Sequence, residues 1–186
     1  MTSSIFSPQV IASIVAAIAA ITAAVIATKA AKRQREAVRV ERRIEYCRQQ
    51  LNDLYGKLYT LRQASKSLYA TLHPGGERPE GWRLVDHVSE IIAEGDTSKI
   101  GTVEEIIKIN KAIEEILVSK SGLLDQFPPP GSFQEFVSHS RQLQVAWAKK
   151  SDLEGPKISF PRGLDQDIKE SILTIRARIS ELDTKR

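Results

Sequence analysis

The N-terminal stretch 5–28 contains 24 residues without a single charged side chain, and a basic segment follows it directly. As an α-helix, these 24 residues would measure about 36 Å, against roughly 30 Å for the hydrocarbon core of a bilayer. A buried helix of this length in a soluble protein normally has a polar side, whereas this block has only scattered polar residues such as Ser13 and Thr22. We therefore predict a transmembrane anchor in residues 1–28.

Two other interpretations of the apolar block stay open, a cleaved secretory signal and a helix of a soluble protein. A secretory signal carries a basic segment before a shorter apolar stretch, but residues 2–10 contain neither lysine nor arginine. Ser7 and Pro8 suit a helix start, because serine caps helix N-termini and proline is favoured at the first helical position. A retained anchor is therefore the preferred interpretation.

The positive charge of the chain is concentrated beside the apolar block. Residues 29–50 carry a net charge of +5 within an overall charge of +4, so the remainder of the chain is almost neutral. Basic residues beside a span favour the cytoplasmic side and attract anionic head groups. We therefore expect an external N-terminus, cytoplasmic residues 29–186 and no nucleic-acid partner. The residues expected to contact lipid head groups are Lys29, Lys32, Arg33 and Arg35.

Apolar residues recur at spacings of four and three from Val40 to Leu72, and Ser65 occupies one of these positions. Such spacing is typical of a helix that packs along one seam. Gly56 lies within this pattern at a cost of about 1 kcal/mol relative to alanine, which is consistent with a close packing point. The sequence therefore predicts one long helix that continues from the anchor.

Extended backwards, the same spacing places small residues along one face of the anchor. This face and a neighbouring row of small residues consist of Ala12, Ala16, Ala19, Ala20, Ala23 and Ala24. Small residues let transmembrane helices approach closely, so these alanines form the candidate interface of a homo-oligomer. The alternative is that alanine and isoleucine are simply an acceptable composition for an anchor.

Beyond a loop at 73–81, hydrophobic periodicity predicts four further helices. They cover residues 82–94, 102–117, 132–147 and 164–182. Capping-box spacing marks two of the expected starts, at Thr102 and Ser132, and no stretch alternates like a β-strand. The expected fold is all-α: a transmembrane helix, a basic juxtamembrane stretch at 29–45, and a cytosolic bundle of four or five antiparallel helices at 46–186.

The sequence offers no motif for catalysis, for a cofactor or for a metal ion. Cys47 is the only cysteine, which excludes an internal disulfide and a CxxC site. His73, His87 and His139 do not have the spacing of a zinc site, and we interpret His87 and His139 as hydrogen-bonded core histidines. We therefore expect no enzymatic activity, cofactor or metal.

A stripe of aromatic and basic residues runs beside the leucine seam. This tyrosine–basic stripe consists of Tyr55, Tyr59, Arg62, Lys66 and Tyr69. Aromatic and basic side chains together can stack single-stranded bases. Tyrosines at helical spacing more often border a core with their hydroxyl groups outward, which is the preferred interpretation here.

Three segments carry a resemblance to known proteins: LYGKLYTLR after the anchor, then FPPPGSFQEFVSHSRQL, and FPRGLD before the last helix. With them the chain resembles small bacterial membrane-anchored helical proteins, and the membrane accessory protein of type VI-B CRISPR systems. The resemblance implies a HEPN-like bundle at the bacterial inner membrane and a ring-shaped pore that supports antiphage defence. Nuclease HEPN domains place more residues between arginine and histidine than the three that separate Arg83 from His87. Ribonuclease activity is therefore not implied.

The leading hypothesis is a non-enzymatic membrane protein that self-associates and acts as a pore-forming or membrane-perturbing accessory in bacterial defence. A membrane-tethered adaptor that binds a soluble protein partner is the main alternative. A divergent membrane-bound ribonuclease that uses His87 or His139 is the third.

Overall fold

The computed structural model describes residues 8–72, 82–153, 156 and 158–184, and the regular structure of this part of the chain is entirely helical. This confirms the all-α prediction. The chain divides into two units, one formed by residues 1–45 with 181–186 and the other by residues 46–180. The helices are α1 (Pro8–Gln49), the π-helix η1 (Gln50–Tyr55), α2 (Gly56–Thr71), the 3₁₀-helix η2 (Leu84–Asp86), α3 (Val88–Glu94), α4 (Thr97–Ser119), the 3₁₀-helix η3 (Ser121–Leu123), α5 (Gly131–Lys149) and α6 (Leu164–Asp183).

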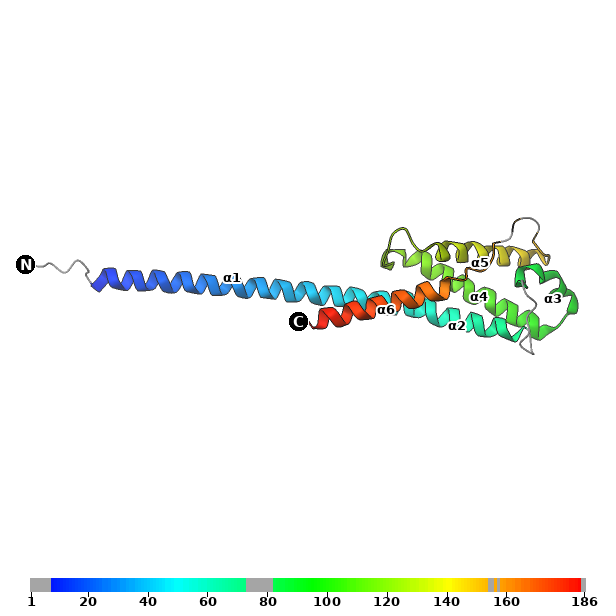
Figure 1. Ribbon diagram of the computed structural model, residues 1–186, viewed down its shortest axis with the longest axis horizontal. Coiled ribbons are helices and arrows are strands. Elements are labelled where there is room, and N and C mark those ends of the chain that lie inside the picture. The colour runs from blue at the N-terminus through cyan, green and yellow to red at the C-terminus, as the bar shows by residue number, and fades with distance from the viewer. Residues whose placement is uncertain (1–7, 73–81, 154–155, 157, 185–186) are drawn as a thin grey trace, which may run out of the picture. The chain divides into compact units, whose positions relative to one another are not determined.

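Helix α1 is a single uninterrupted helix that begins at Pro8 (Figure 1). Ser7, its expected cap, lies outside the described residues. Alanine has the highest helix propensity, and at helical spacing the alanines lie on one side of this segment while isoleucine and valine lie on the other. All side chains from 9 to 39 are exposed, including large apolar ones such as Val15 at 60% and Ile21 at 65%. The helix is long and apolar enough to cross a membrane.

The predicted seam is buried in the second unit, where Cys47, Leu54 and Leu58 belong to the apolar core. A turn of π-helix interrupts the α-helical register at Gln50–Tyr55, and it places Gln50 and Tyr55 in the core beside the seam. The amide of Gly56 donates to the carbonyl oxygen of Leu51 in this wider turn. The close approach at Gly56 is therefore to its own helix.

Side chains from η1 and the end of α1 fasten the turn after α4. Tyr46 Oη donates to the carbonyl oxygen of Gly122 at 3.2 Å, and Gln50 Nε2 donates to that of Leu123 at 2.8 Å. Tyr55 Oη accepts from the amide of Asp125 at 3.1 Å, and the Asp125 carboxylate pairs with Arg178 of α6 at 2.7 Å. The turn at 122–125 is thus held by side chains from three helices, α1, η1 and α6.

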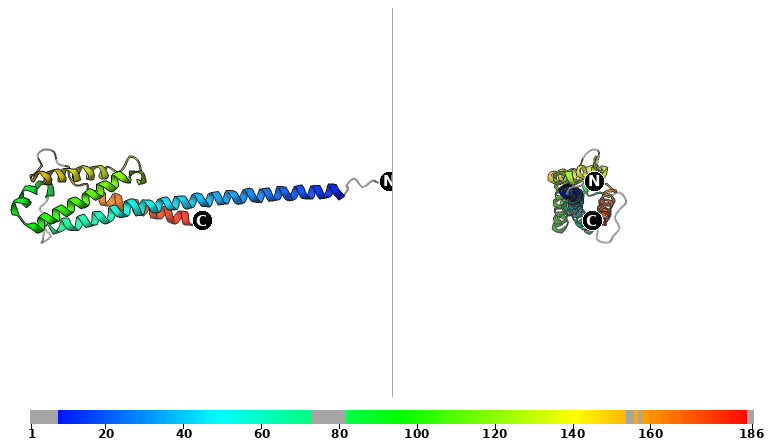
Figure 2. Two further views of the ribbon diagram at one scale, coloured as in Figure 1. Left: turned by 180° about the vertical axis from the view of Figure 1, so that it is seen from behind. Right: turned by 90° about the vertical axis from the view of Figure 1, so that its left-hand side faces the viewer.

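Helix α4 lies alongside both α2 and α5, as Figures 1 and 2 show from opposite sides. Two long-range hydrogen bonds give the relative direction of α2 and α4. Tyr55, before the start of α2, bonds to Asp125 beyond the end of α4, whereas Ser65 inside α2 bonds to Asn110 inside α4. Helices α2 and α4 are therefore antiparallel. Two apolar clusters form the core of this bundle.

Two of the expected helix starts are wrong. Helix α4 begins at Thr97, because the Asp96 carboxylate accepts from the amides of Ser98 and Lys99. The helix then passes through Gly101, and Thr102 Oγ1 donates to the carbonyl oxygen of Ser98 within it.

Helix α5 begins at Gly131 after Pro130, and no side chain caps it. The Ser132 hydroxyl donates to Asp167 of α6, so its bond joins two helices and does not cap α5. The predicted loop 73–81 lies outside the described residues, and the helix predicted for residues 82–94 is split into η2 and α3.

Candidate functional site

A cavity of about 270 Å³ opens between α2, α4 and α5, entirely within the second unit. Its deeper walls are apolar and come from Leu84, Ile106 and Leu143, which are buried. On the side that faces solvent, Lys66 and Ala70 of α2 line it. Because it is concave and mostly apolar with a few polar groups, this cavity is a candidate binding site of the bundle.

One polar pair is set into this apolar lining. Ser65 Oγ donates to Asn110 Oδ1 at 3.0 Å, and the two residues are only 4% and 5% exposed. The amide nitrogen of Asn110 has no hydrogen-bond partner among the residues that the structure describes. A buried amide normally uses its donors, so this group can serve a bound molecule.

Charged groups lie beside the polar pair. Arg62 Nε is 2.8 Å from Asp165 Oδ1, and Lys66 Nζ is 3.4 Å from Asp165 Oδ2. The Arg62 guanidinium also lies 4.3 Å from the centre of the Phe160 ring. Burial lowers the pKa of Arg62, while the charge and hydrogen bond of Asp165 oppose that shift. Two cations thus share one carboxylate at this site.

His139 packs against the same aromatic ring. Its Nδ1 lies 2.8 Å from the carbonyl oxygen of Ile158, and its ring meets Phe160 edge-on at 5.5 Å. Burial lowers the pKa of His139, the bond to Ile158 raises it, and the positive charges of Arg83 and Arg62 lower it further. Neutral His139 therefore donates its Nδ1–H to the Ile158 carbonyl. This is the hydrogen-bonded histidine expected from the sequence, although it is only partly buried.

His87 lies away from His139, at the N-terminal end of α3. Its Nδ1 is 2.8 Å from Glu90 Oε2, and its ring stacks on Trp82 with centroids 5.0 Å apart. Arg83 Nε donates to Asp86 Oδ2 at 2.7 Å. The neighbouring Arg83 and His87 are therefore each bonded to a carboxylate on their own segment, and His87 is only partly buried.

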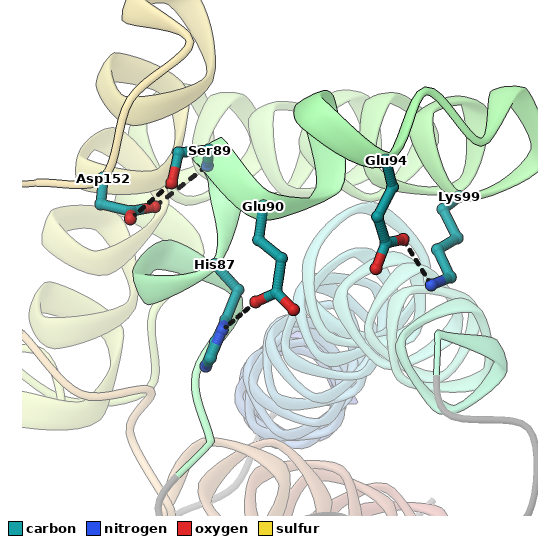
Figure 3. Close-up of polar contacts among 6 residues, drawn as sticks. All are labelled: His87, Ser89, Glu90, Glu94, Lys99 and Asp152. Carbon is teal, nitrogen blue, oxygen red and sulfur yellow. Dashed lines mark hydrogen bonds and ion pairs between the residues drawn. The ribbon is translucent and has the colours of Figure 1, made fainter.

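Figure 3 shows the polar contacts around α3. His87 and Glu90 point toward one another, and Lys99 Nζ reaches Glu94 Oε2 at 2.6 Å. Asp152, in the segment after α5, accepts from both the amide and the hydroxyl of Ser89, at 3.1 Å and 2.7 Å. An acceptor at the first turn of a helix satisfies amides that lack an intrahelical partner. These contacts fasten α3 to its neighbours.

The structure divides the tyrosine–basic stripe. Arg62, Lys66 and Tyr69 line the cavity, whereas the Tyr55 side chain is buried in the core and Tyr59 is exposed. The stripe is therefore not one continuous stacking surface. His73 lies outside the described residues, and within the described part no group of His, Cys, Asp or Glu is arranged to hold a metal ion.

The residues that the sequence singled out in the predicted anchor and in the basic stretch after it are all exposed. This applies to the candidate interface, Ala12, Ala16, Ala19, Ala20, Ala23 and Ala24, and to the candidate head-group contacts, Lys29, Lys32, Arg33 and Arg35. Exposure leaves both sets accessible to lipid or to a second copy of the chain.

Sequence reasoning missed Asn110, Phe160 and Asp165. Asn110 was detectable, because it occupies a core-facing position between Ile106 and Ile113 of a helix rich in isoleucine. A polar residue at such a position requires a partner. Phe160 and Asp165 had no comparable signal, since they come from the segment before α6 and from its first turn.

These observations define an all-helical protein whose N-terminal helix is long and apolar enough to cross a membrane. No protein-family model matches the chain, and no curated protein or solved structure matches it.

Proposed function

We propose that this protein is a single-pass membrane protein that self-associates through the alanine face of α1 and perturbs or permeabilises the membrane. The N-terminus would lie outside, and the helical bundle would lie in the cytoplasm of a bacterium. The proposal includes the role in antiphage defence that the resemblance implies. It assigns no catalytic residue to the bundle.

The observation that carries the proposal is the exposure of the uncharged, mostly apolar part of α1, residues 9–28. A soluble monomer rarely shows so large an apolar surface, and such surfaces mark membrane or protein contacts. The basic residues that follow suit the cytoplasmic head-group region. In a bilayer, large apolar side chains are solvated by lipid as well as by protein, so they give no driving force for helix association. Close packing of small residues is what would favour a helix–helix contact there.

A membrane-tethered adaptor is the second candidate, and an apolar groove in the bundle favours it. The groove has a volume of about 470 Å³ and is lined by residues such as Leu117, Leu124 and Val137 from the end of α4, the turn after it and α5. Phe127 in the loop before α5 is 96% exposed. Exposed apolar side chains that gather at one place on a surface often mark a contact site for a protein partner.

Two tagged copies of the full chain, expressed together in bacteria, test self-association. We expect one tag to capture the other from detergent-solubilised membranes, and the purified protein to release dye from liposomes. Capture should be lost in the double variant Ala16→Leu/Ala23→Leu, because leucine keeps the helices apart without reducing insertion.

The two candidates give different results in the same experiment. A stoichiometric soluble partner without tag-to-tag capture and without dye release would favour the adaptor and contradict self-association. Recovery of the unaltered chain in the soluble fraction would contradict both candidates, since each requires the anchor.

A further inference from the structure

We propose that the cavity between α2, α4 and α5 is a binding site for a small organic anion, a carboxylate with an apolar body. This site is independent of the anchor and of self-association. It follows from three features of the cavity: its apolar walls, its free amide and its excess of positive charge.

The walls of the cavity determine the polarity and size of the part of the ligand that carries the carboxylate. Leu84, Ile106 and Leu143 are buried side chains that present only carbon to the cavity, and the ring of Phe160 forms a further wall. Apolar walls favour an apolar occupant, because apolar surface that is removed from water on binding contributes favourably. The volume of about 270 Å³ lies just below the range of about 300–1,000 Å³ typical of ligand pockets, which indicates a small molecule.

The polar pair gives the site a donor in the interior. Asn110 Oδ1 is occupied by the Ser65 hydroxyl, which fixes the orientation of the amide and leaves its nitrogen as the available group. Asn110 as a residue is 5% exposed, but its amide nitrogen is not among the described buried polar atoms that lack a partner, so this donor opens into the cavity. There it can donate to an acceptor. An oxygen of the bound molecule would supply that acceptor.

The charged side chains at the cavity determine the sign of the charge on the ligand. Arg62 and Lys66 carry two positive charges, and Asp165, which contacts both, supplies one negative charge. Arg62 is held close to Asp165, but Lys66 is largely exposed and its contact is the longer one. An exposed ion pair of this kind contributes little, so Lys66 is able to turn toward a ligand carboxylate. The Asp165 carboxylate limits the site to a single anionic group.

Fluorine NMR on the full-length protein in nanodiscs tests this site with para-fluorohydrocinnamate as the probe. Its uncharged primary amide and empty nanodiscs provide the comparisons. We expect saturable broadening of the acid signal and binding of the amide that is weaker by about tenfold, since a charged hydrogen bond is lost.

Three variants locate the binding. Ala70→Phe closes the exposed side of the cavity and should abolish binding, while Lys66→Gln should weaken binding of the acid about tenfold without affecting the amide. Lys57→Gln is the matched control, because Lys57 lies on the same helix and pairs with Asp53 away from the cavity. It should bind the probe as the unaltered chain does.

The result that would overturn the proposal is equally specific. Absence of saturable broadening, equal binding of acid and amide, or binding that survives Ala70→Phe would each show that the cavity does not select a carboxylate. Because Ala70 is exposed, its substitution should leave the fold intact, which circular dichroism and the thermal midpoint verify. Asn110→Leu supplies a second variant, with lost binding expected at unchanged helicity.

Discussion

A Cβ atom at Gly56 would lie 2.6 Å from the carbonyl oxygen of Leu51, the acceptor of the Gly56 amide. The π-helical turn brings this oxygen toward the Gly56 α-carbon, so only glycine fits without a shift of the backbone. The same turn places Gln50 and Tyr55 in the core. The glycine and the two buried polar residues are therefore consequences of one local departure from α-helical geometry, a feature often found at functional positions.

Gly56→Ala should destabilise the protein although alanine is the better helix former. The contact with the Leu51 oxygen should cost about 1–3 kcal/mol, typical of overpacking, which outweighs a propensity gain of about 1 kcal/mol. We expect a lower thermal midpoint for the full chain in detergent, by about 2–4 °C for each 1 kcal/mol lost.

Gly101→Ala is the matched control, because Gly101 lies inside α4 and a Cβ atom there would meet nothing within 4 Å. Its midpoint should rise, since alanine contributes about 0.5–1 kcal/mol in an unobstructed helix. A rise for both variants would show that the turn at Gln50–Tyr55 has no steric requirement for glycine.

Tyr55→Phe should remove the acceptor of the Asp125 amide while it preserves the buried ring. The unpaired amide should cost about 1–3 kcal/mol of unfolding free energy, because the group is only partly reached by water. Chemical denaturation of the full chain measures this loss. Tyr59→Phe, an exposed position one turn further on, should cause almost no change. Equal effects of the two substitutions would contradict the role assigned to the Tyr55 hydroxyl.

His139 should make the protein less stable in mild acid. Burial lowers the pKa of folded His139 below its ordinary value of 6.5, so the unfolded chain binds the proton more readily. Unfolding free energy rises with pH wherever the unfolded state holds more protons, and it should therefore fall as the pH drops through about 6.5.

Comparison with His139→Asn isolates this contribution, because asparagine can still donate to the Ile158 carbonyl while it cannot titrate. The unaltered chain should lose more stability than the variant between neutral and mildly acidic pH. Both proteins retain the other histidines, whose contributions cancel in the difference. Parallel stability curves would show that the His139 pKa is unchanged by folding.

The spacing of apolar residues predicted the helical fold and the buried seam, because core burial follows helical periodicity. It could not predict the π-helix, which depends on the fit of Gln50 and Tyr55 against a turn that lies about 70 residues away. The predicted starts of α4 and α5 were wrong because sequence spacing does not show which side chains make the capping and tertiary contacts. Thr102 and Ser132 had suitable spacing, but Asp96 was a better cap and Asp167 was a tertiary partner.

The candidate site was predictable only in part. The sequence singled out Arg62, Lys66 and Tyr69, which do line the cavity. It placed Tyr55 and Tyr59 with them, although one of these is buried in the core and the other is exposed outside the cavity. The partners that complete the site come from other helices, and contacts of this range are set by how the helices pack.

The most direct test of the proposed function is the mass of the full-length protein in mild detergent, measured by light scattering. The account predicts a discrete multiple of the 20.7 kDa chain that falls to the monomer in Ala16→Leu/Ala23→Leu. Ile14→Phe/Ile21→Phe adds bulk with the same spacing on a face about 160° away around the helix and should leave the multimer intact. A monomeric mass for the unaltered chain would contradict self-association.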